Sequence, residues 1–162
     1  MIVVVMGVSG AGKTTVGNLL AQRLGCEFLE GDDFHPPQNV AKMAVGTPLG
    51  DEDRWPWLAR LNARLRECEQ RGENAVVACS ALKQTYREKL GAGLTRCEIV
   101  FLNGTCKLIE SRLKERRHRY MPPSLLESQF DALEPPADAI DIDIAQPAER
   151  CVELVCRVLS LC

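Results

Sequence analysis

The sequence lacks the features that mark membrane, secreted and nucleic-acid-binding proteins. No apolar run approaches the length of a membrane span. Met1 leads directly into an apolar, β-branched segment, so we expect no signal peptide. The charge is nearly balanced, with 20 Lys and Arg residues against 22 Asp and Glu residues, so a surface built to hold nucleic acid is not expected. These absences predict a cytoplasmic protein that binds neither a membrane nor a nucleic acid.

Cysteine is abundant, but the spacings that give it a special role are missing. None of the eight cysteines forms a C-x-x-C pair, which argues against a zinc site or a redox motif. Without a secretory signal, disulfide bonds are not expected either. Most of the cysteines stand in apolar segments, where a free thiol packs as a small hydrophobic side chain. We therefore expect all eight to be reduced, with core packing as their ordinary role.

Internal repeats, low-complexity tracts and linkers are also missing, and the 162 residues suit one compact domain. Apolar, β-branched runs alternate with segments of helical periodicity. This alternation predicts an α/β fold in which helices cover both faces of a parallel sheet. Asp51 and Asp53 offer N-caps for one long helix. The expected strands are residues 2–5, 27–30, 75–79, 97–102 and 139–143, and the expected helices are residues 13–24, 38–44, 51–71, 81–90, 105–117, 124–133 and a closing helix from 147.

Residues 7–14, with the sequence Gly-Val-Ser-Gly-Ala-Gly-Lys-Thr, form the most informative segment. They match the phosphate-binding pattern G-x-x-x-x-G-K-[ST] and stand between an expected strand and an expected helix, which is the context that this loop needs. Backbone amides of the loop and the positive end of the helix attract a polyphosphate. Lys13 is expected to reach the β- and γ-phosphates of ATP, and the Thr14 hydroxyl to bind Mg²⁺. The predicted nucleotide-binding residues here are Gly7, Val8, Ser9, Gly10, Ala11, Gly12, Lys13, Thr14 and Thr15.

An acidic cluster follows the expected strand at 27–30. Phosphoryl transfer to an alcohol needs a carboxylate that orients the hydroxyl and takes its proton, and ligands of open α/β sheets bind beyond the carboxyl ends of the strands. Asp32 is the candidate base, with Glu30 or Asp33 as holders of a Mg²⁺-bound water; the alternative is an ordinary solvated acidic turn. No carboxylate follows the strand at 75–79, and no N-K-x-D motif is present. The sequence therefore favours a small-molecule kinase over a motor ATPase or a GTPase.

Cationic residues follow two further strands. Arg54 opens a helix, and Lys83 and Arg87 follow the third expected strand. These cations suit an anionic acceptor, with ordinary surface charge as the alternative. After the fourth strand, Arg112 and Arg116 share a helix face, where a basic segment closing over ATP would neutralise charge and exclude water. A solvated basic face or a nucleic-acid patch is the alternative there.

Several blocks of the chain, from about residue 4 to residue 147, carry a resemblance. They are residues 6–13, 31–36, 39–43, 46–49, 51–58, 79–83 with 86–87, 110–113 and 128–130. In these blocks the chain resembles the thermoresistant-type gluconokinases. The resemblance implies a P-loop fold like that of nucleoside monophosphate kinases, with a five-stranded parallel sheet, a substrate-binding segment at about 34–58 and a lid at about 112–135. It also implies, commonly, a homodimer.

The resemblance further implies transfer of the γ-phosphoryl group of ATP to the 6-hydroxyl of D-gluconate. Asp32 would then orient or deprotonate that hydroxyl, whereas Arg116 and Pro147 would flank the adenine and Arg112 would lie near the phosphates. From the residues alone, a kinase of another small anionic alcohol such as shikimate stays open, as does a nucleotide-binding module without turnover. The residues that the resemblance implies for holding the polyol acid are His35, Arg54, Lys83 and Arg87.

Overall fold

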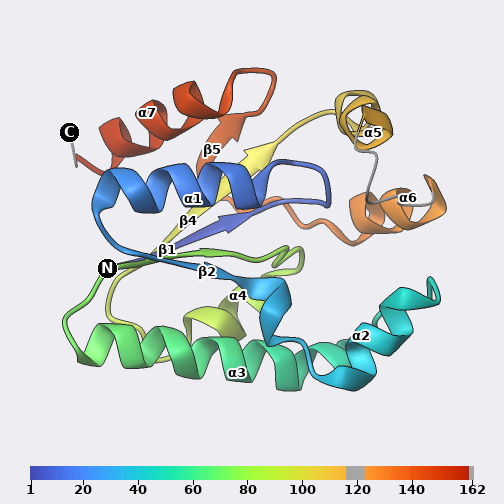
Figure 1. The fold of residues 1–162 in the computed structure, drawn as a ribbon, viewed down its shortest axis with the longest axis horizontal. Helices are drawn as coiled ribbons and strands as arrows, with labels where there is room; N and C mark the ends of the chain where they lie inside the picture. Colours follow the sequence, from blue (N-terminus) through green and yellow to red (C-terminus); the bar gives the residue numbers. More distant parts are fainter. Residues whose placement is uncertain (116–122, 161–162) are drawn as a thin grey trace.

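The computed structural model describes residues 1–115 and 123–160, in which strands and helices alternate (Figure 1). Within these residues no helix is both long and apolar enough to span a membrane. The elements are β1 (Ile2–Met6), α1 (Lys13–Leu24), β2 (Glu27–Glu30), the 3-10 turn η1 (Gly31–Phe34), α2 (Pro37–Ala44), α3 (Asp51–Gln70), β3 (Ala75–Ala78), α4 (Gln84–Gly91), β4 (Cys97–Asn103), α5 (Cys106–Glu115), α6 (Pro123–Ala132), β5 (Ile140–Asp143) and α7 (Ala148–Val158).

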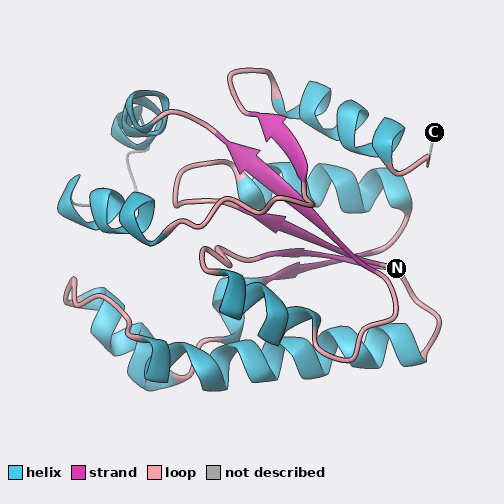
Figure 2. Cartoon of the chain, turned by 180° about the vertical axis from the view of Figure 1, so that it is seen from behind, coloured by secondary structure: helices cyan, strands magenta, loops and turns pink. Residues whose placement is uncertain are grey.

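The strands form one parallel five-stranded sheet in the order β2-β3-β1-β4-β5, which confirms the expected fold class. Helices lie on both sides of the sheet (Figure 2). In the central strand β1, Val3 and Val5 pack with α1 and α7, whereas Ile2, Val4 and Met6 pack with α3 and α4. Successive side chains of a strand point to opposite faces. A strand buried on both faces therefore needs an unbroken apolar run, and β1 has one.

The start of α3 differs from the expectation. Gly50 is the N-cap residue, so the prediction of Asp51 or Asp53 as N-cap is wrong. Asp53 instead stands in the first turn, where its Oδ2 accepts a hydrogen bond of 3.0 Å from the Gly50 amide. A carboxylate at this position satisfies one free amide of the helix end from inside the helix rather than from before it.

The start of α4 also differs, because the helix begins at Gln84 and not at residue 81. Ala81 has a φ of 44°, in the left-handed region, and Lys83 is extended, so neither continues a helix. The Gln84 amide donates to the carboxylate of Glu134 over 2.6 Å. This cap comes from a residue 50 positions away in the sequence, and it holds the segment after α6 against the loop after β3.

The structure describes seven of the eight cysteines. Six of them are buried or partly buried, in keeping with a packing role, but Cys106 is exposed at the start of α5. Core packing, the ordinary role expected of these cysteines, therefore does not apply to Cys106. Cys162 lies outside the described residues.

The parallel sheet brings the carboxyl ends of all five strands to one edge. The strand order reverses around β1, which lies between β3 and β4. In open α/β sheets the ligand crevice lies outside the carboxyl ends at such a reversal. The loops that follow the strands at this edge carry most of the site residues predicted from the sequence.

Candidate active site

The loop between β1 and α1 curls around the side chain of Lys13. Gly10 and Gly12 adopt φ angles of 85° and 99°, which glycine reaches without strain. The Lys13 ammonium donates to the carbonyl oxygen of Val8 over 3.1 Å, across the loop. The predicted residues 7–14 thus form a compact turn at the N-terminus of α1, where backbone amides and the helix dipole favour a bound phosphate.

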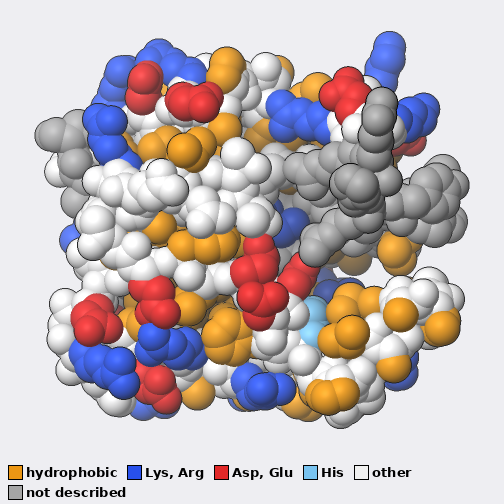
Figure 3. All heavy atoms as spheres, viewed as in Figure 1, with side chains coloured by type: hydrophobic (Ala, Val, Ile, Leu, Met, Phe, Trp, Pro, Cys, Tyr) orange, Lys and Arg blue, Asp and Glu red, His pale blue; other side chains and the backbone are white. Residues whose placement is uncertain are grey.

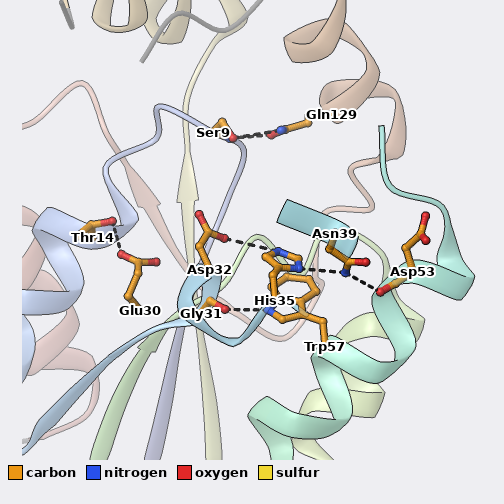
Figure 4. Close-up of polar contacts among 10 residues, drawn as sticks. All are labelled: Ser9, Thr14, Glu30, Gly31, Asp32, His35, Asn39, Asp53, Trp57 and Gln129. Carbon is orange, nitrogen blue, oxygen red and sulfur yellow. Dashed lines mark hydrogen bonds and ion pairs between the residues drawn. The ribbon is translucent and has the colours of Figure 1, made fainter. Parts of the chain in front are cut away.

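Thr14 and Glu30 come together beside this loop (Figure 4). The Thr14 hydroxyl donates to the Glu30 carboxylate over 2.7 Å, so the first turn of α1 meets the end of β2. Among the described residues, no group of three or more His, Cys, Asp and Glu side chains could hold a metal ion. An oxygen pair of this kind fits Mg²⁺, which keeps several waters and takes one or two protein oxygens beside substrate phosphates.

The turn η1 carries Asp32 and is fixed by backbone packing. A Cβ on Gly31 would lie 2.3 Å from the carbonyl oxygen of Ala78 in β3, so the turn lies directly on the neighbouring strand. On its other side, the Trp57 indole donates to the Gly31 carbonyl over 2.7 Å. The Asp32 side chain remains 62% exposed at the carboxyl edge of the sheet. A rigid turn thus presents a solvent-accessible carboxylate beside the phosphate loop.

His35 lies behind Asp32 and is nearly buried. Its ring stacks on Trp57 with centroids 4.0 Å apart, and its Nε2 lies 3.9 Å from Asp32 Oδ1. Asn39 Nδ2 donates a hydrogen bond of 2.7 Å to the backbone carbonyl oxygen of Asp53. The same nitrogen lies 3.2 Å from His35 Nδ1. Figure 4 shows the side chains of Asp32, His35 and Asn39 in a row that ends at the backbone carbonyl of Asp53. In the space-filling view a small patch of histidine colour lies at the surface next to acidic side chains (Figure 3).

These contacts assign the tautomer of His35. A backbone carbonyl only accepts hydrogen bonds, so the amide nitrogen of Asn39 must face both Asp53 and His35. His35 Nδ1 is then an acceptor, and the proton is on Nε2, on the side of Asp32. Burial lowers the pKa of His35, with the charge of Asp32 opposing and that of Arg54 adding to this effect. A neutral imidazole with one N–H therefore stands behind the candidate base.

Asn39 was missed as a site residue by sequence reasoning, which quoted it only within a block of resemblance. Helical spacing could not have pointed to it, because His35 and Pro36 are extended and lie before α2. Its Oδ1 is buried without a hydrogen-bond partner among the described residues. The asparagine is thus held by its two donor contacts alone.

Arg54 and Lys83 are brought together by Tyr86, to which the sequence analysis assigned no role of its own. Their charged groups lie 5.3 and 5.4 Å from the centre of the Tyr86 ring, close enough for cation–π attraction. Lys83 also pairs with Asp51 over 2.9 Å, and the Tyr86 hydroxyl donates to the same carboxylate. The hydrogen bond to Asp51 raises the pKa of Lys83. The two side chains lie at the N-terminal ends of α3 and α4.

Arg87 lies against the loop before α4. Its guanidinium donates to the carbonyl oxygens of Ala81 and Leu82, each over 3.0 Å. It therefore supports the loop on which Lys83 stands, and its predicted contact with the acceptor stays a prediction.

A cavity of about 290 Å³ lies next to the phosphate loop. It is lined by Thr15, Arg112 and Pro147, three of the residues predicted to contact the nucleotide. Arg112 donates to the Ile144 carbonyl, which ties α5 to the loop before α7. Arg116, predicted to flank the adenine, lies outside the described residues. A cavity that is reached from the phosphate loop and lined by these side chains suits the base and ribose of a nucleotide.

The fold and these contacts define a P-loop kinase of a small molecule. The AAA domain family matches residues 2–136. A probable gluconokinase of Xenopus tropicalis is 44% identical over 163 residues, covering 88% of this chain and 86% of its own. The gluconokinase of Gluconobacter oxydans is 51% identical over 135 residues, covering 83% of this chain and 76% of its own. The chain therefore belongs to the gluconokinase family, as the resemblance of its sequence predicts.

Solved structures agree with this assignment. The crystal structure of a gluconokinase from Sinorhizobium meliloti superimposes with a TM-score of 0.89 at 42% identity, covering 98% of this chain and 90% of that one. A shikimate kinase from Aquifex aeolicus superimposes with a TM-score of 0.62 at 18% identity, which is a likeness of fold alone. The comparisons thus favour gluconate over the shikimate alternative that the residues left open.

Proposed function

We propose that this chain transfers the γ-phosphoryl group of ATP to the 6-hydroxyl group of D-gluconate, giving ADP and 6-phospho-D-gluconate. The observation that carries the proposal is the convergence of three features at one edge of the sheet. The phosphate loop, the Thr14–Glu30 pair and the exposed carboxylate of Asp32 all follow parallel strands that end there. Membership of the gluconokinase family supports gluconate as the acceptor.

On the nucleotide side, residues 7–15 hold the phosphates and Lys13 leaves the Val8 carbonyl to bind the β- and γ-phosphates. Arg112 lies near the phosphates and Pro147 lies against the base, in keeping with the cavity that they line. Mg²⁺ fits beside Thr14 and Glu30 and, when bound, supplies charge neutralisation on the phosphate oxygens. Arg116 completes the base contact in this proposal.

On the acceptor side, the oxygen of the gluconate 6-hydroxyl attacks the γ-phosphorus, and the bond from this phosphorus to the leaving ADP oxygen breaks. Asp32 takes the proton of the attacking hydroxyl. The Nε2–H of His35 orients this carboxylate or a neighbouring hydroxyl of the sugar acid. Arg54 and Lys83 hold the carboxylate of gluconate, since guanidinium and ammonium groups bind carboxylates strongly. Catalysis then comes mainly from positioning and charge neutralisation.

The remaining parts of the proposal concern organisation. Residues 34–58 bind the acceptor, and residues 112–135 serve as the lid over the nucleotide. The protein works in the cytoplasm, as its sequence predicts, and forms a homodimer, as is common among the gluconokinases that it resembles.

A coupled assay tests the proposal. Purified protein is supplied with MgATP and, in parallel, with gluconate, shikimate or a nucleoside monophosphate, and ADP release is followed. Turnover of gluconate well above that of the other acceptors is expected. Nucleotide binding without turnover of gluconate would contradict the proposal and favour a non-catalytic module.

A further inference from the structure

The side chain of Gln129 on α6 forms a reciprocal pair with Ser9 of the phosphate loop. The Ser9 amide donates to Gln129 Oε1 over 2.7 Å, and Gln129 Nε2 donates to the Ser9 hydroxyl over 3.1 Å. Figure 4 shows this carboxamide pointing at the loop from the opposite side to Thr14 and Glu30. The two bonds set the orientation of the carboxamide, because a backbone amide can only donate.

The peptide unit between Val8 and Ser9 is therefore held from two sides. Its carbonyl oxygen accepts from the Lys13 ammonium over 3.1 Å, and its N–H donates to Gln129. When Lys13 turns to a bound phosphate, the contact with the Val8 carbonyl is given up. The contact with Gln129 does not involve the lysine and can persist.

The position of Gln129 is itself well supported. Leu126, one turn earlier on α6, is 2% exposed and belongs to the same core cluster as Val8. Just after α6, the Glu134 amide donates to the Leu82 carbonyl over 2.9 Å, and its carboxylate accepts from the Gln84 amide. The helix is thus anchored at its apolar face and beyond its C-terminal end. Gln129 reaches the loop from a fixed support.

We infer that Gln129 is a positioning residue of the phosphate loop: it keeps the Val8–Ser9 peptide in one orientation, so that Lys13 can leave this peptide for the γ-phosphate without the loop rearranging. The inference rests on the proposed function only in naming the γ-phosphate of ATP as the group that Lys13 reaches. Reversing this peptide would break the hydrogen bond from the Ser9 amide to Gln129 Oε1.

Nucleotide binding by the purified full chain tests this inference, measured by titration calorimetry with MgATP and MgADP in the absence of gluconate. Gln129→Ala removes both bonds and is expected to weaken ATP binding about tenfold, the effect of losing one to two hydrogen bonds. In steady state the KM for ATP rises accordingly, while the KM for gluconate is unchanged. Ser128→Ala is the matched control, because this exposed neighbour on α6 bonds only to the Leu125 carbonyl among the described residues.

A second variant separates positioning from simple support of the fold. Gln129→Glu keeps an acceptor for the Ser9 amide and lets the Ser9 hydroxyl donate, but it adds a negative charge beside the loop. It is expected to restore most of the ADP affinity and to weaken ATP binding at least about threefold more than ADP binding, because of repulsion from the terminal phosphate. Ser128→Glu adds the same charge at the neighbouring exposed position.

The outcomes are distinct. Wild-type affinity for both nucleotides in Gln129→Ala overturns the inference, and so does an equal rise in both KM values together with a lower Tm. An unchanged ratio of ATP to ADP affinity in Gln129→Glu overturns the naming of the γ-phosphate as the group beside which Gln129 holds this peptide. Weakened nucleotide binding in a protein that does not turn over gluconate would leave this inference standing while the proposed function fails.

Discussion

Gly31→Ala is the sharpest test of how the fold places Asp32. A Cβ at Gly31 would lie 2.3 Å from the Ala78 carbonyl oxygen and 3.4 Å from two further backbone atoms of β3 and its end. These neighbours belong to a buried strand and cannot rotate aside as a side chain can. The added methyl group therefore has to be relieved by movement of η1, which carries Asp32.

The size of that movement follows from the contact. Ordinary van der Waals contact for a Cβ begins at about 3.4 Å, so the turn must retreat by roughly 1 Å. A misplacement of this size at a catalytic group reduces turnover by about 10²-fold. Overpacking at a buried site also destabilises a protein by about 1–3 kcal/mol. The Gly31 carbonyl, which accepts from Trp57, moves with the turn.

The assay is kcat at saturating MgATP and gluconate, with nucleotide affinity and Tm measured on the same samples. Turnover is expected to fall about 10²-fold while ATP affinity stays near that of the wild type, because Gly31 packs on β3 and bonds to Trp57, on the acceptor side of the site. Gly91→Ala is the matched control: its Cβ would meet only the Cys97 Sγ, at 3.9 Å. If both variants turn over gluconate alike, packing of η1 on β3 does not position the base.

Three further predictions follow from the site. Asp32→Asn is expected to lower kcat by about 10²-fold or more with little change in ATP affinity, as for loss of a general base; a wild-type kcat would remove Asp32 from that role. Glu30→Gln is expected to raise the Mg²⁺ concentration for half-maximal activity about tenfold. Asp33→Asn removes the same charge nearby and should leave this concentration unchanged. Equal effects of the two substitutions would refute the placing of Mg²⁺ beside Thr14 and Glu30. Burial lowers the pKa of His35. Below about pH 6.5, His35 therefore binds a proton in the unfolded chain more readily than in the folded chain. The free energy of unfolding of the wild type should therefore fall more steeply than that of His35→Gln from pH 6.5 to 5, by at most about 1.4 kcal/mol per pH unit in urea titrations, and parallel slopes would contradict a buried neutral imidazole.

Much of the fold was predictable because its signals are local. The β-branched run of β1 and the helical spacing of Trp57, Leu61 and Leu65 reflect burial that each element needs wherever its partners come from. The helix ends were less predictable. Whether Gly50 or Asp53 caps α3 depends on the backbone angles of single residues. The start of α4 depends on Glu134, a residue that follows α6 and is 50 positions away in the sequence.

The candidate site divides in the same way. The phosphate loop and the acid cluster were predictable, because each needs particular residue types within a few positions of a strand end. The tautomer of His35 was not, since it depends on which carbonyl orients Asn39. The engagement of Arg87 with the carbonyl oxygens of Ala81 and Leu82 was hidden for the same reason.

The sequence by itself therefore determined the class of chemistry: a loop for phosphate, a carboxylate for a hydroxyl and cations for an anionic acceptor. Only the tertiary structure decided which groups work as pairs, such as Thr14 with Glu30 and Ser9 with Gln129. The physical reason is that a motif depends on the short reach of the backbone. A hydrogen bond between residues 120 positions apart depends on how every element between them packs.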